Sequence, residues 1–515
     1  MRRGDREDEA VRPERTGPSV PVAMDGDAFR QAGHALVDRI ADLLESVPDG
    51  AVAPGLSPDR IREILGADGG LPEEGEEAGR ALGRAADLLA ANSLFNGHPR
   101  FFGYITSAPA PIGMLGDLLA AAVNPNVGGW SLSPMATEIE AQTVRWMAEL
   151  VGYPSDSGGL LVSGGNMANF VAFLAARAAA GADREVRSRG LAEGGGPPLR
   201  VYGSAETHTW IEKASDLSGL GTDAVRWIDT DDELRMDVDA LRRAVAEDRA
   251  AGFQPMLVVG TGGSVSTGAV DPLPALAALC RDEGIWFHVD GAYGGFAAAV
   301  PEAPDDLRGL AVADSVAIDP HKWLYAPLEA GAVLVRRPGA LREAFAYHPP
   351  YYYFGVEATN YVDYGPQNSR GFRALKVWLA LRQAGRGGYV RMISDDMALS
   401  RRLHRRAGDH PELETMAQGL SIAVFRYVPP ELRGRTGEEE VEAYLNELNR
   451  EIQDRLERGG EAFVSNAVIR GRYGLRACIV NFNTTDADVD ALPGIVAGVG
   501  RAAHEDLGGP PLEER

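Results

Sequence analysis

The sequence predicts an α/β protein with a mostly parallel central sheet, preceded by a helical segment and followed by a small α+β domain. Between about residues 111 and 376, continuous apolar stretches alternate with helical patterns, which is typical of a sheet covered by helices on both faces. A chain of 515 residues is also too long for one ordinary core. We therefore expect five parts: a disordered leader over residues 1–23, a helical dimerisation segment over 24–110, a large domain over 111–376, a small domain over 377–505 and a tail over 506–515.

The N-terminal region predicts helices that cannot form a core by themselves. Residues 1–23 are polar, contain prolines and lack a hydrophobic period, so we expect them to be disordered. A first helix is indicated by apolar residues at helical spacing, which are Phe29, Ala32, Leu36, Ile40 and Leu43. A second helix is expected within residues 71–93. Two such helices need a partner surface, either the next domain or a second subunit.

The central region contains six predicted strands. They are GGLLVSGG (158–165), LRVYGS (199–204), PMLVVGTGG (255–263), WFHVDGAYGG (286–295), DSVAIDP (314–320) and GAVLVRR (331–337). Most are apolar without alternation, which indicates strands buried on both faces. Beyond residue 377, helical stretches are joined by the strands LSIAVFRYV (420–428) and LRACIVNF (475–482). Ligands on parallel sheets bind at the carboxyl ends of the strands, so we expect the site there.

The composition excludes several classes of partner. The chain is 45% hydrophobic and 24% charged, as in soluble globular proteins, and its formal net charge of -23 disfavours nucleic acid and anionic membranes. Cys280 and Cys478 lie in apolar surroundings far apart in the sequence, so we expect reduced core residues and neither a disulfide nor a metal site. The N-terminus does not resemble a signal peptide, and no run of about 18 apolar residues occurs, so a cytoplasmic protein is expected.

The chemistry of the chain points to one of its three lysines, which are Lys213, Lys322 and Lys376. Lys322 lies in AIDPHKWLYA (317–326), just after a predicted strand. Arginine supplies nearly all the other positive charge, but a guanidinium does not form a Schiff base with an aldehyde, whereas a lysine amine does. The retention of an amine at this position therefore suggests carbonyl chemistry.

Two further elements suit a pyridoxal phosphate site. Asp290 ends a predicted strand and is followed by Gly-Ala-Tyr-Gly-Gly, which leaves room for a flat ligand. The stretch LLVSGGNMANF brings Ser163, Gly164, Gly165 and Asn166 to the start of a helix, where backbone N–H groups bind phosphate. Pyridoxal phosphate needs an amine for its aldehyde, an anion for its ring nitrogen and N–H donors for its phosphate. The combination is far more specific than any of its parts.

The chain resembles the pyridoxal-phosphate-dependent group II amino-acid decarboxylases, the family of aromatic-L-amino-acid and glutamate decarboxylases. The resemblance covers residues 24 to about 505 and rests on the motifs HPRFFGY, SGGNMAN, HVDGAYGG and DPHKW. It implies a fold-type-I, aminotransferase-like fold and a homodimer whose active site is shared between subunits. It also implies decarboxylation of an L-amino acid to its amine through a Lys322 aldimine and a quinonoid intermediate.

The resemblance assigns roles to the cofactor site residue by residue. Lys322 resembles the lysine that binds the cofactor, Asp290 the partner of the pyridinium nitrogen, and His208 the histidine that stacks on the ring. Ala292 takes the small position on the opposite face of the ring. The phosphate contacts are expected from Gly164, Gly165, Asn166, Ser264 and His321.

Two positions depart from the family pattern. Asp319 stands where animal aromatic decarboxylases often have an asparagine that binds the phosphate, and a carboxylate there would repel a phosphate dianion, so that role is not transferred. Val265 replaces a threonine near the phosphate and removes one hydroxyl donor. Neither change affects the amine or the carboxylate that the cofactor ring needs.

The family loop after the lysine strand carries a tyrosine near the substrate α-carbon, where related aldehyde synthases have phenylalanine. Ungapped counting places Tyr351 at this position, with Tyr352 and Tyr353 next to it, and therefore favours decarboxylation over oxidative deamination. The resemblance places five residues in the substrate pocket, in part from the second subunit: Tyr104, Ser107, Val127, Gly128 and Arg370.

Three alternatives to an aromatic decarboxylase stay open. Val127, Gly128 and Gly129 leave one wall of the pocket small, which suits an aromatic ring, whereas Asn124 and Asn126 are similar to the glutamate-decarboxylating branch. The first alternative is therefore a decarboxylase of glutamate or another acidic amino acid, and the second is an aldehyde synthase. The third is a non-catalytic regulatory protein on the same fold, which the presence of every cofactor element disfavours.

Overall fold

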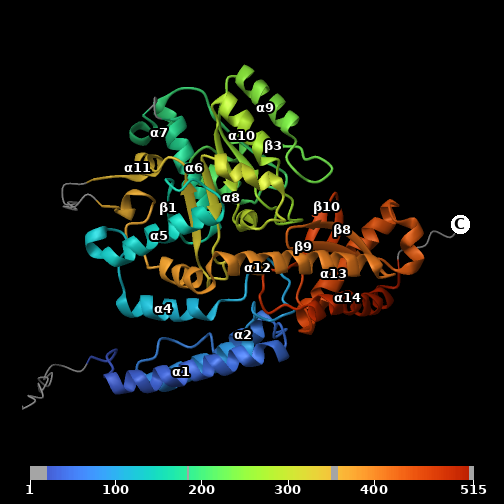
Figure 1. The fold of residues 1–515 in the computed structure, drawn as a ribbon. Helices are drawn as coiled ribbons and strands as arrows, with labels where there is room; N and C mark the ends of the chain where they lie inside the picture. Colours follow the sequence, from blue (N-terminus) through green and yellow to red (C-terminus); the bar gives the residue numbers. More distant parts are fainter. Residues whose placement is uncertain (1–19, 182–184, 349–357, 510–515) are drawn as a thin grey trace, which may run out of the picture. The chain divides into compact units, whose positions relative to one another are not determined.

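The computed structural model describes residues 20–181, 185–348 and 358–509 (Figure 1). Contacts within the chain divide it into two compact units. The first unit comprises Met1–Asp49 and Leu56–Ser93, and the second comprises Gly50–Gly55 and Leu94–Arg515. The helical N-terminal segment is thus separate from the part of the chain that carries both β-sheets.

The first unit consists of the helices α1 (Gly26–Ser46), α2 (Pro58–Leu65) and α3 (Ala78–Asn92). Asp25 caps α1 by accepting hydrogen bonds from two backbone N–H groups of its first turn. α1 packs on α3, and Arg39 pairs with Asp87 between them at 2.7 Å. None of the three helices has a buried residue, in agreement with the prediction that this segment has no core of its own.

The second unit contains a seven-stranded sheet in the order β1-β7-β6-β5-β4-β2-β3. β2 to β6 run parallel to one another, and β7 is antiparallel to β1 and β6, so the sheet is mostly parallel, as predicted. β3 was not predicted from the sequence, because its pattern is short and half exposed. The strands are β1 (Gly158–Val162), β2 (Leu199–Ser204), β3 (Val225–Ile228), β4 (Gln254–Thr261), β5 (Trp286–Asp290), β6 (Ser315–Ile318) and β7 (Gly331–Val335).

Helices from between the strands cover this sheet (Figure 1). α6 packs against β1, β4, β5, β6 and β7 through a stripe of alanines and other apolar residues, α5 packs against β1 and β7, and α9 and α10 pack against strands between β3 and β5. Their bounds are α4 (Pro111–Val123), α5 (Pro134–Leu150), α6 (Gly165–Ala180), α7 (Val186–Gly194), α8 (Trp210–Leu217), α9 (Val238–Ala250), α10 (Leu273–Glu283) and α11 (Gly339–Phe345). This cover explains why the strands are apolar without alternation.

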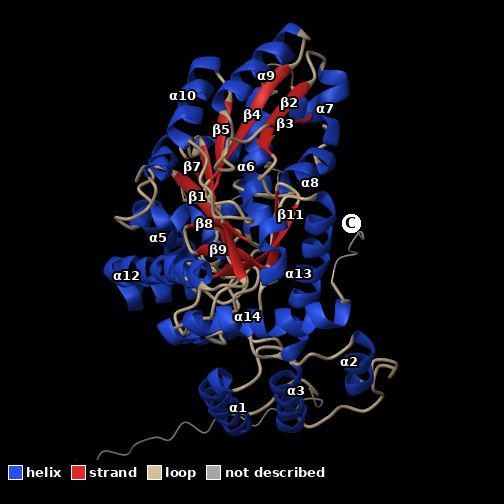
Figure 2. Cartoon of the chain, turned by 90° about the vertical axis from the view of Figure 1, so that its right-hand side faces the viewer, coloured by secondary structure: helices blue, strands red, loops and turns tan. Residues whose placement is uncertain are grey.

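A second, antiparallel sheet follows in the order β10-β11-β9-β8, and Figure 2 shows the strands of both sheets in red. It packs on the long helix α12, which bends at Gly385, where φ is 63°. β8 and β10 were not predicted from the sequence. The elements are α12 (Ala374–Asp409), β8 (Leu413–Gly419), β9 (Ile422–Tyr427), α13 (Glu439–Gly459), β10 (Ser465–Ile469), β11 (Arg472–Cys478) and α14 (Asp486–Leu507).

One hydrophobic core joins the two sheets of the second unit. Val289 of β5 and Val424 of β9 belong to the same cluster of buried apolar residues. Cys280 and Cys478 are both buried in this core, as expected. Within residues 20–181, 185–348 and 358–509, no helix is long and apolar enough to span a membrane.

Candidate active site

Lys322 and Asp290 follow neighbouring parallel strands and face one cavity. Asp290 is the last residue of β5 and pairs with Ala317 of β6, and Lys322 lies in the turn directly after β6. The Lys322 amine lies 3.2 Å from Oδ2 of Asp319 in the same turn. The expectation that strand ends would bring the carboxylate and the amine together is therefore correct in this fold.

The cavity has a volume of about 410 Å³ and lies at the carboxyl ends of the parallel strands. Its walls come from the segment before α4, the start of α6, the ends of β4, β5 and β6, and β11 of the second sheet. The lining residues are Tyr104, Ile105, Thr106, Gly165, Asn166, Asn169, Glu206, His208, Thr261, Gly263, Val265, Asp290, Ala292, Tyr293, Asp319, His321, Lys322 and Arg476.

Asp290 is held in place on both of its oxygens. Trp210 Nε1 donates to Oδ2 at 2.7 Å, and the backbone N–H of Ala292 donates to Oδ1 at 3.1 Å. His288, two residues before Asp290 on β5, is hydrogen-bonded through Nδ1 to the Ser315 hydroxyl at 2.9 Å and through Nε2 to Oδ1 of Asn169 at 2.7 Å. Burial lowers the pKa of His288 to about 4, so this imidazole is neutral and does not neutralise the Asp290 carboxylate. Asp290 can therefore offer its charge to a cation in the cavity.

The glycine turn before α6 leaves a cradle beside Asp319. Gly164 has a φ of 86°, which favours glycine, and Gly165 is the first residue of α6. A Cβ atom on Gly165 would lie 2.5 Å from Asp319 Oδ2 and 3.1 Å from the Cβ of Ala292. Any side chain at this position would fill the space where the helix presents its free N–H groups, so the cradle suits a phosphate group.

Two histidines border the cavity. His208 is exposed there, and its Nδ1 accepts a hydrogen bond from the backbone N–H of Trp210 at 3.2 Å, so the neutral ring carries its proton on Nε2. His321 is buried, with Nδ1 2.6 Å from the carbonyl oxygen of Ala330 and Nε2 3.7 Å from Asp319 Oδ2. Both rings are thus held at one nitrogen and present the other to the cavity side.

Four buried polar atoms of the cavity wall have no hydrogen-bond partner among the described residues. They are Thr106 Oγ1, Thr261 Oγ1, Asp319 Oδ1 and the Nε of Arg476. A buried polar atom without a partner is costly, so such atoms around one cavity indicate a polar ligand. An aldehyde-reactive amine, a fixed carboxylate and a phosphate cradle are the groups that pyridoxal phosphate requires, so the residues present fit this cofactor.

The predicted site residues fall into three groups. Those that line the cavity are Lys322, His208, Asp290, Gly165, Asn166, Ala292, His321 and Tyr104. Those beside it or away from it are Gly164, Ser264, Ser107, Val127, Gly128 and Arg370. Tyr351 lies outside the described residues, as do Tyr352 and Tyr353.

Ser264 and Ser107 do not line the cavity but lie next to residues that do. Ser264 is buried, and its hydroxyl lies 3.0 Å from that of Thr267, while its neighbours Gly263 and Val265 line the cavity. The hydroxyl of Ser107 donates to the backbone carbonyl of His321 at 2.8 Å. This hydrogen bond stabilises the turn that carries Lys322.

Arg370, Val127 and Gly128 form a separate buried cluster. The Arg370 guanidinium donates to the carbonyl oxygen of Val127 at 2.8 Å and pairs with both oxygens of Glu140. A Cβ on Gly128 would lie 2.3 Å from the carbonyl oxygen of Asn368. These residues do not reach the cavity of their own chain, and their contribution to a second subunit stays a prediction.

Arg476, which was not predicted as a site residue, reaches the cavity from β11. Its side chain is 3% exposed, and one of its terminal nitrogens donates to the carbonyl oxygen of Val265. An arginine within the apolar strand LRACIVNF was a usable signal, because an unpaired charge is almost never buried without a function.

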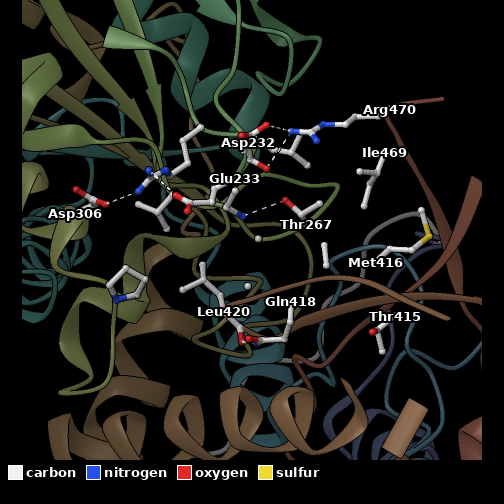
Figure 3. A pocket seen from close by; sticks show the side chains of 18 of the residues that line it. Asp232, Glu233, Thr267, Asp306, Thr415, Met416, Gln418, Leu420, Ile469 and Arg470 are labelled. Atoms are coloured by element: carbon white, nitrogen blue, oxygen red, sulfur yellow. Dashed lines mark hydrogen bonds and ion pairs between the residues drawn. The ribbon is translucent and has the colours of Figure 1, made fainter. Parts of the chain in front are cut away.

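A larger cavity of about 570 Å³ lies elsewhere, between the loops after β3 and β4 and the second sheet (Figure 3). Its charged side chains pair with one another, for example Arg470 with Asp232 at 2.9 Å and Arg235 with Asp306 at 3.8 Å. It contains neither a lysine nor an unpartnered buried polar atom among the described residues. The chemistry therefore points to the smaller cavity.

Comparison with known sequences finds relatives along most of the chain. Residues 58–428 match the family model of the pyridoxal-dependent decarboxylase conserved domain. The aromatic-L-amino-acid decarboxylase of Bacillus atrophaeus is 31% identical over 92% of this chain and 95% of its own length. The tyrosine decarboxylase of Oryza sativa subsp. japonica is 32% identical over 92% of both chains. A phenylacetaldehyde synthase of a Rosa hybrid cultivar is 28% identical over 90% of this chain and 92% of its own.

Solved structures show the same fold. Mouse CSAD superposes with a TM-score of 0.87 at 29% identity and covers 93% of this chain and 99% of its own. Oryza sativa TDC, solved with PLP and tryptamine, superposes with a TM-score of 0.85 at 27% identity over 93% and 99%. The predicted fold-type-I architecture is confirmed. By its fold and by a family model that spans most of its length, the chain belongs to the pyridoxal-dependent decarboxylases, carboxy-lyases whose cofactor is pyridoxal 5'-phosphate.

Proposed function

We propose that this enzyme decarboxylates an aromatic L-amino acid to the corresponding amine, with Lys322 as the cofactor lysine. The observation that carries the proposal is the meeting of Lys322, Asp290 and the Gly165 cradle in one cavity. When bound, pyridoxal phosphate supplies an electron sink for the carbanion that the loss of carbon dioxide creates. The protein supplies the amine, the anion for the ring nitrogen and the phosphate donors.

Each residue has a defined task in this proposal. Asp290, fixed by Trp210 and the Ala292 N–H, holds a proton on the cofactor ring nitrogen. The Lys322 amine would hold the cofactor through its aldehyde group. His208 faces the cavity, where its Nε2–H can donate a hydrogen bond to the substrate. Tyr351 is proposed to approach the α-carbon, as the resemblance implies.

The charge of the cavity favours a substrate with one carboxylate. Apart from Lys322, Arg476 is the one permanent cation among the described residues that line it, and its Nε has no partner there. We assign it to the α-carboxylate of the substrate. An acidic amino acid would bring a second carboxylate toward Asp290, Asp319 and Glu206 without a second free cation to receive it. The apolar atoms of Ile105, Tyr293 and Val265 suit an aromatic ring instead.

A panel of L-amino acids tests the proposal. Tyrosine, tryptophan and dihydroxyphenylalanine should release carbon dioxide and an equal amount of amine, whereas glutamate should not. Faster turnover of glutamate would contradict the aromatic assignment. Release of ammonia and peroxide instead of amine would identify an aldehyde synthase, the activity named for the Rosa relative.

We also propose a homodimer with a shared active site in the cytoplasm. α4 exposes an apolar face formed by Leu115, Leu118, Leu119 and Val123, which a second copy could cover. The cluster of Arg370, Val127 and Gly128 would then lie near the partner's cavity. Light scattering should give twice the chain mass, and an active monomer would contradict the dimer.

A further inference from the structure

Asp396 of α12 holds the turn that carries Lys322 through two hydrogen bonds. Its Oδ2 accepts hydrogen bonds from Trp323 Nε1 at 3.0 Å and from the Tyr325 hydroxyl at 2.8 Å. Asp396 is 2% exposed and does not line the cavity. We infer that Asp396 is a positioning residue that holds the Lys322 turn in its reactive geometry through Trp323 and Tyr325, an inference that rests on the proposed role of Lys322.

The geometry of the turn explains why a side-chain anchor matters. Trp323 follows Lys322 directly in the sequence. Contacts that hold its indole ring therefore also restrict the backbone from which the lysine side chain extends. Tyr325 has a φ of 52°, a left-handed conformation that a tyrosine rarely adopts without support. Two further contacts hold the same turn: Tyr293 stacks on Trp323 at 4.9 Å, and the Tyr389 hydroxyl donates to the carbonyl oxygen of Leu324 at 3.1 Å.

Asp396 also connects the lysine turn to the second sheet. The backbone of Asn481, just after β11, acts on the same carboxylate and lowers its pKa, against the effect of burial. The amide of Asn481 in turn donates to the carbonyl oxygen of His98 at 2.8 Å. β11 carries Arg476, so one carboxylate links the segment that positions the cofactor lysine with the strand that brings the substrate-side cation.

Trp323 and Tyr325 both donate to Oδ2 of Asp396, and an ionised carboxylate accepts from both without offering a proton of its own. Burial keeps the Tyr325 phenol protonated by raising its pKa, so the phenol stays a donor. Burial likewise raises the pKa of Asp396 to about 7, against the opposing effect of its hydrogen bonds. The other titratable groups facing this pair are Tyr389, Cys478 and Asp395. A proton on Asp396 would remove the charge that strengthens both hydrogen bonds and would therefore loosen the turn near neutral pH.

The variant D396N tests the inference on the holoenzyme, because an amide keeps the shape of the side chain but removes the charge that strengthens its two hydrogen bonds. We expect kcat to fall on the order of tenfold with KM within about twofold, as for a small displacement of a catalytic group. We also expect the wild-type rise of kcat through neutral pH to disappear, and the visible absorbance band of the bound cofactor to change its pH dependence. The matched control is D395N, which removes the same charge from the exposed neighbour.

Two further variants keep the test independent of folding. W323F and Y325F each remove one donor and should each give part of the kcat loss, and Y325F should add little to D396N because both break one interaction. A D396N enzyme with the wild-type pH profile and absorbance would overturn the inference, even if its melting temperature were lower. Borohydride reduction and peptide mapping of the wild type locate the cofactor lysine separately, so failure of the proposed role of Lys322 is recognised by itself.

Discussion

The amine of Lys322 lies 3.2 Å from a carboxylate oxygen of Asp319, three residues before it in the turn after β6. The Asp319 side chain is 2% exposed and lies against Gly165 at the start of α6, where the phosphate of the cofactor is expected. The sequence left the role of this aspartate open. The structure makes it the counter-ion of the lysine before cofactor binds.

This arrangement predicts that Asp319 opposes cofactor binding. Binding consumes the Lys322 amine, so the ion pair is lost, and it brings a phosphate dianion toward the remaining carboxylate. D319N removes both costs and should tighten the dissociation constant for pyridoxal phosphate by about tenfold, or about 1.4 kcal/mol. Titration of the cofactor-free enzyme by absorbance measures it, with D395N as the charge-matched control. Weaker binding in D319N would show that Asp319 helps to hold the phosphate.

K322R should abolish the reaction without unfolding the protein. The guanidinium keeps the positive charge beside Asp319 but cannot form a Schiff base. We expect the loss of the visible cofactor band and of borohydride labelling, with an unchanged circular dichroism spectrum. K213R is the matched control, because Lys213 lies on α8 and does not line the cavity. Labelling of another lysine in the wild type would contradict the assignment.

D290N should separate cofactor binding from catalysis. An amide keeps the shape of Asp290 but provides no charge to hold a proton on the ring nitrogen. We expect kcat to fall by about 10²–10³-fold, the range for loss of one preorganised charge interaction, while the cofactor remains bound. W210F, which removes only the Nε1 donor at 2.7 Å, should cost less. Equal losses in the two variants would show that orientation, and not charge, is what Asp290 supplies.

R476Q should weaken substrate binding more than cofactor binding. The side chain is buried at the cavity wall, and its loss removes the cation assigned to the α-carboxylate. We expect KM to rise by about tenfold or more, in line with the loss of a charged hydrogen bond of about 1.5–3 kcal/mol. Kinetics with the best amino acid of the panel measure it, and R470Q at the paired, exposed Arg470 is the control. An unchanged KM would assign Arg476 to structure alone.

The pKa of Asp396 predicts how its replacement changes stability with pH. The pKa is about 7 in the folded protein and near 4 in an unfolded chain, so the folded state binds the extra proton between these values. The stability that this group contributes is present below about pH 4 and is lost as the pH rises through 7, by on the order of 4 kcal/mol. Urea unfolding at several pH values should show wild type losing stability relative to D396N across this window. Parallel curves for the two proteins would contradict the assignment.

Part of the site was predictable because it depends on local sequence. Lys322, Asp290 and Gly165 each lie at the end of a strand or the start of a helix, and a parallel sheet gathers such ends at one edge. Arg476 could not be placed in the same way, because it comes from a different sheet more than 150 residues along the chain. Likewise β3, β8 and β10 are short or half exposed, so their residues carry no clear period.

The sequence by itself determined the fold class, the cofactor and the three groups that the cofactor needs, because strand ends and residue chemistry are local properties. Only the tertiary structure decided the rest. It showed that Asp319 pairs with Lys322, that Arg476 reaches the cavity, that Arg370 pairs with Glu140 away from it, and that Asp396 grips the lysine turn. The physical reason is that each of these contacts joins side chains whose meeting depends on how helices and sheets pack, which no local pattern encodes.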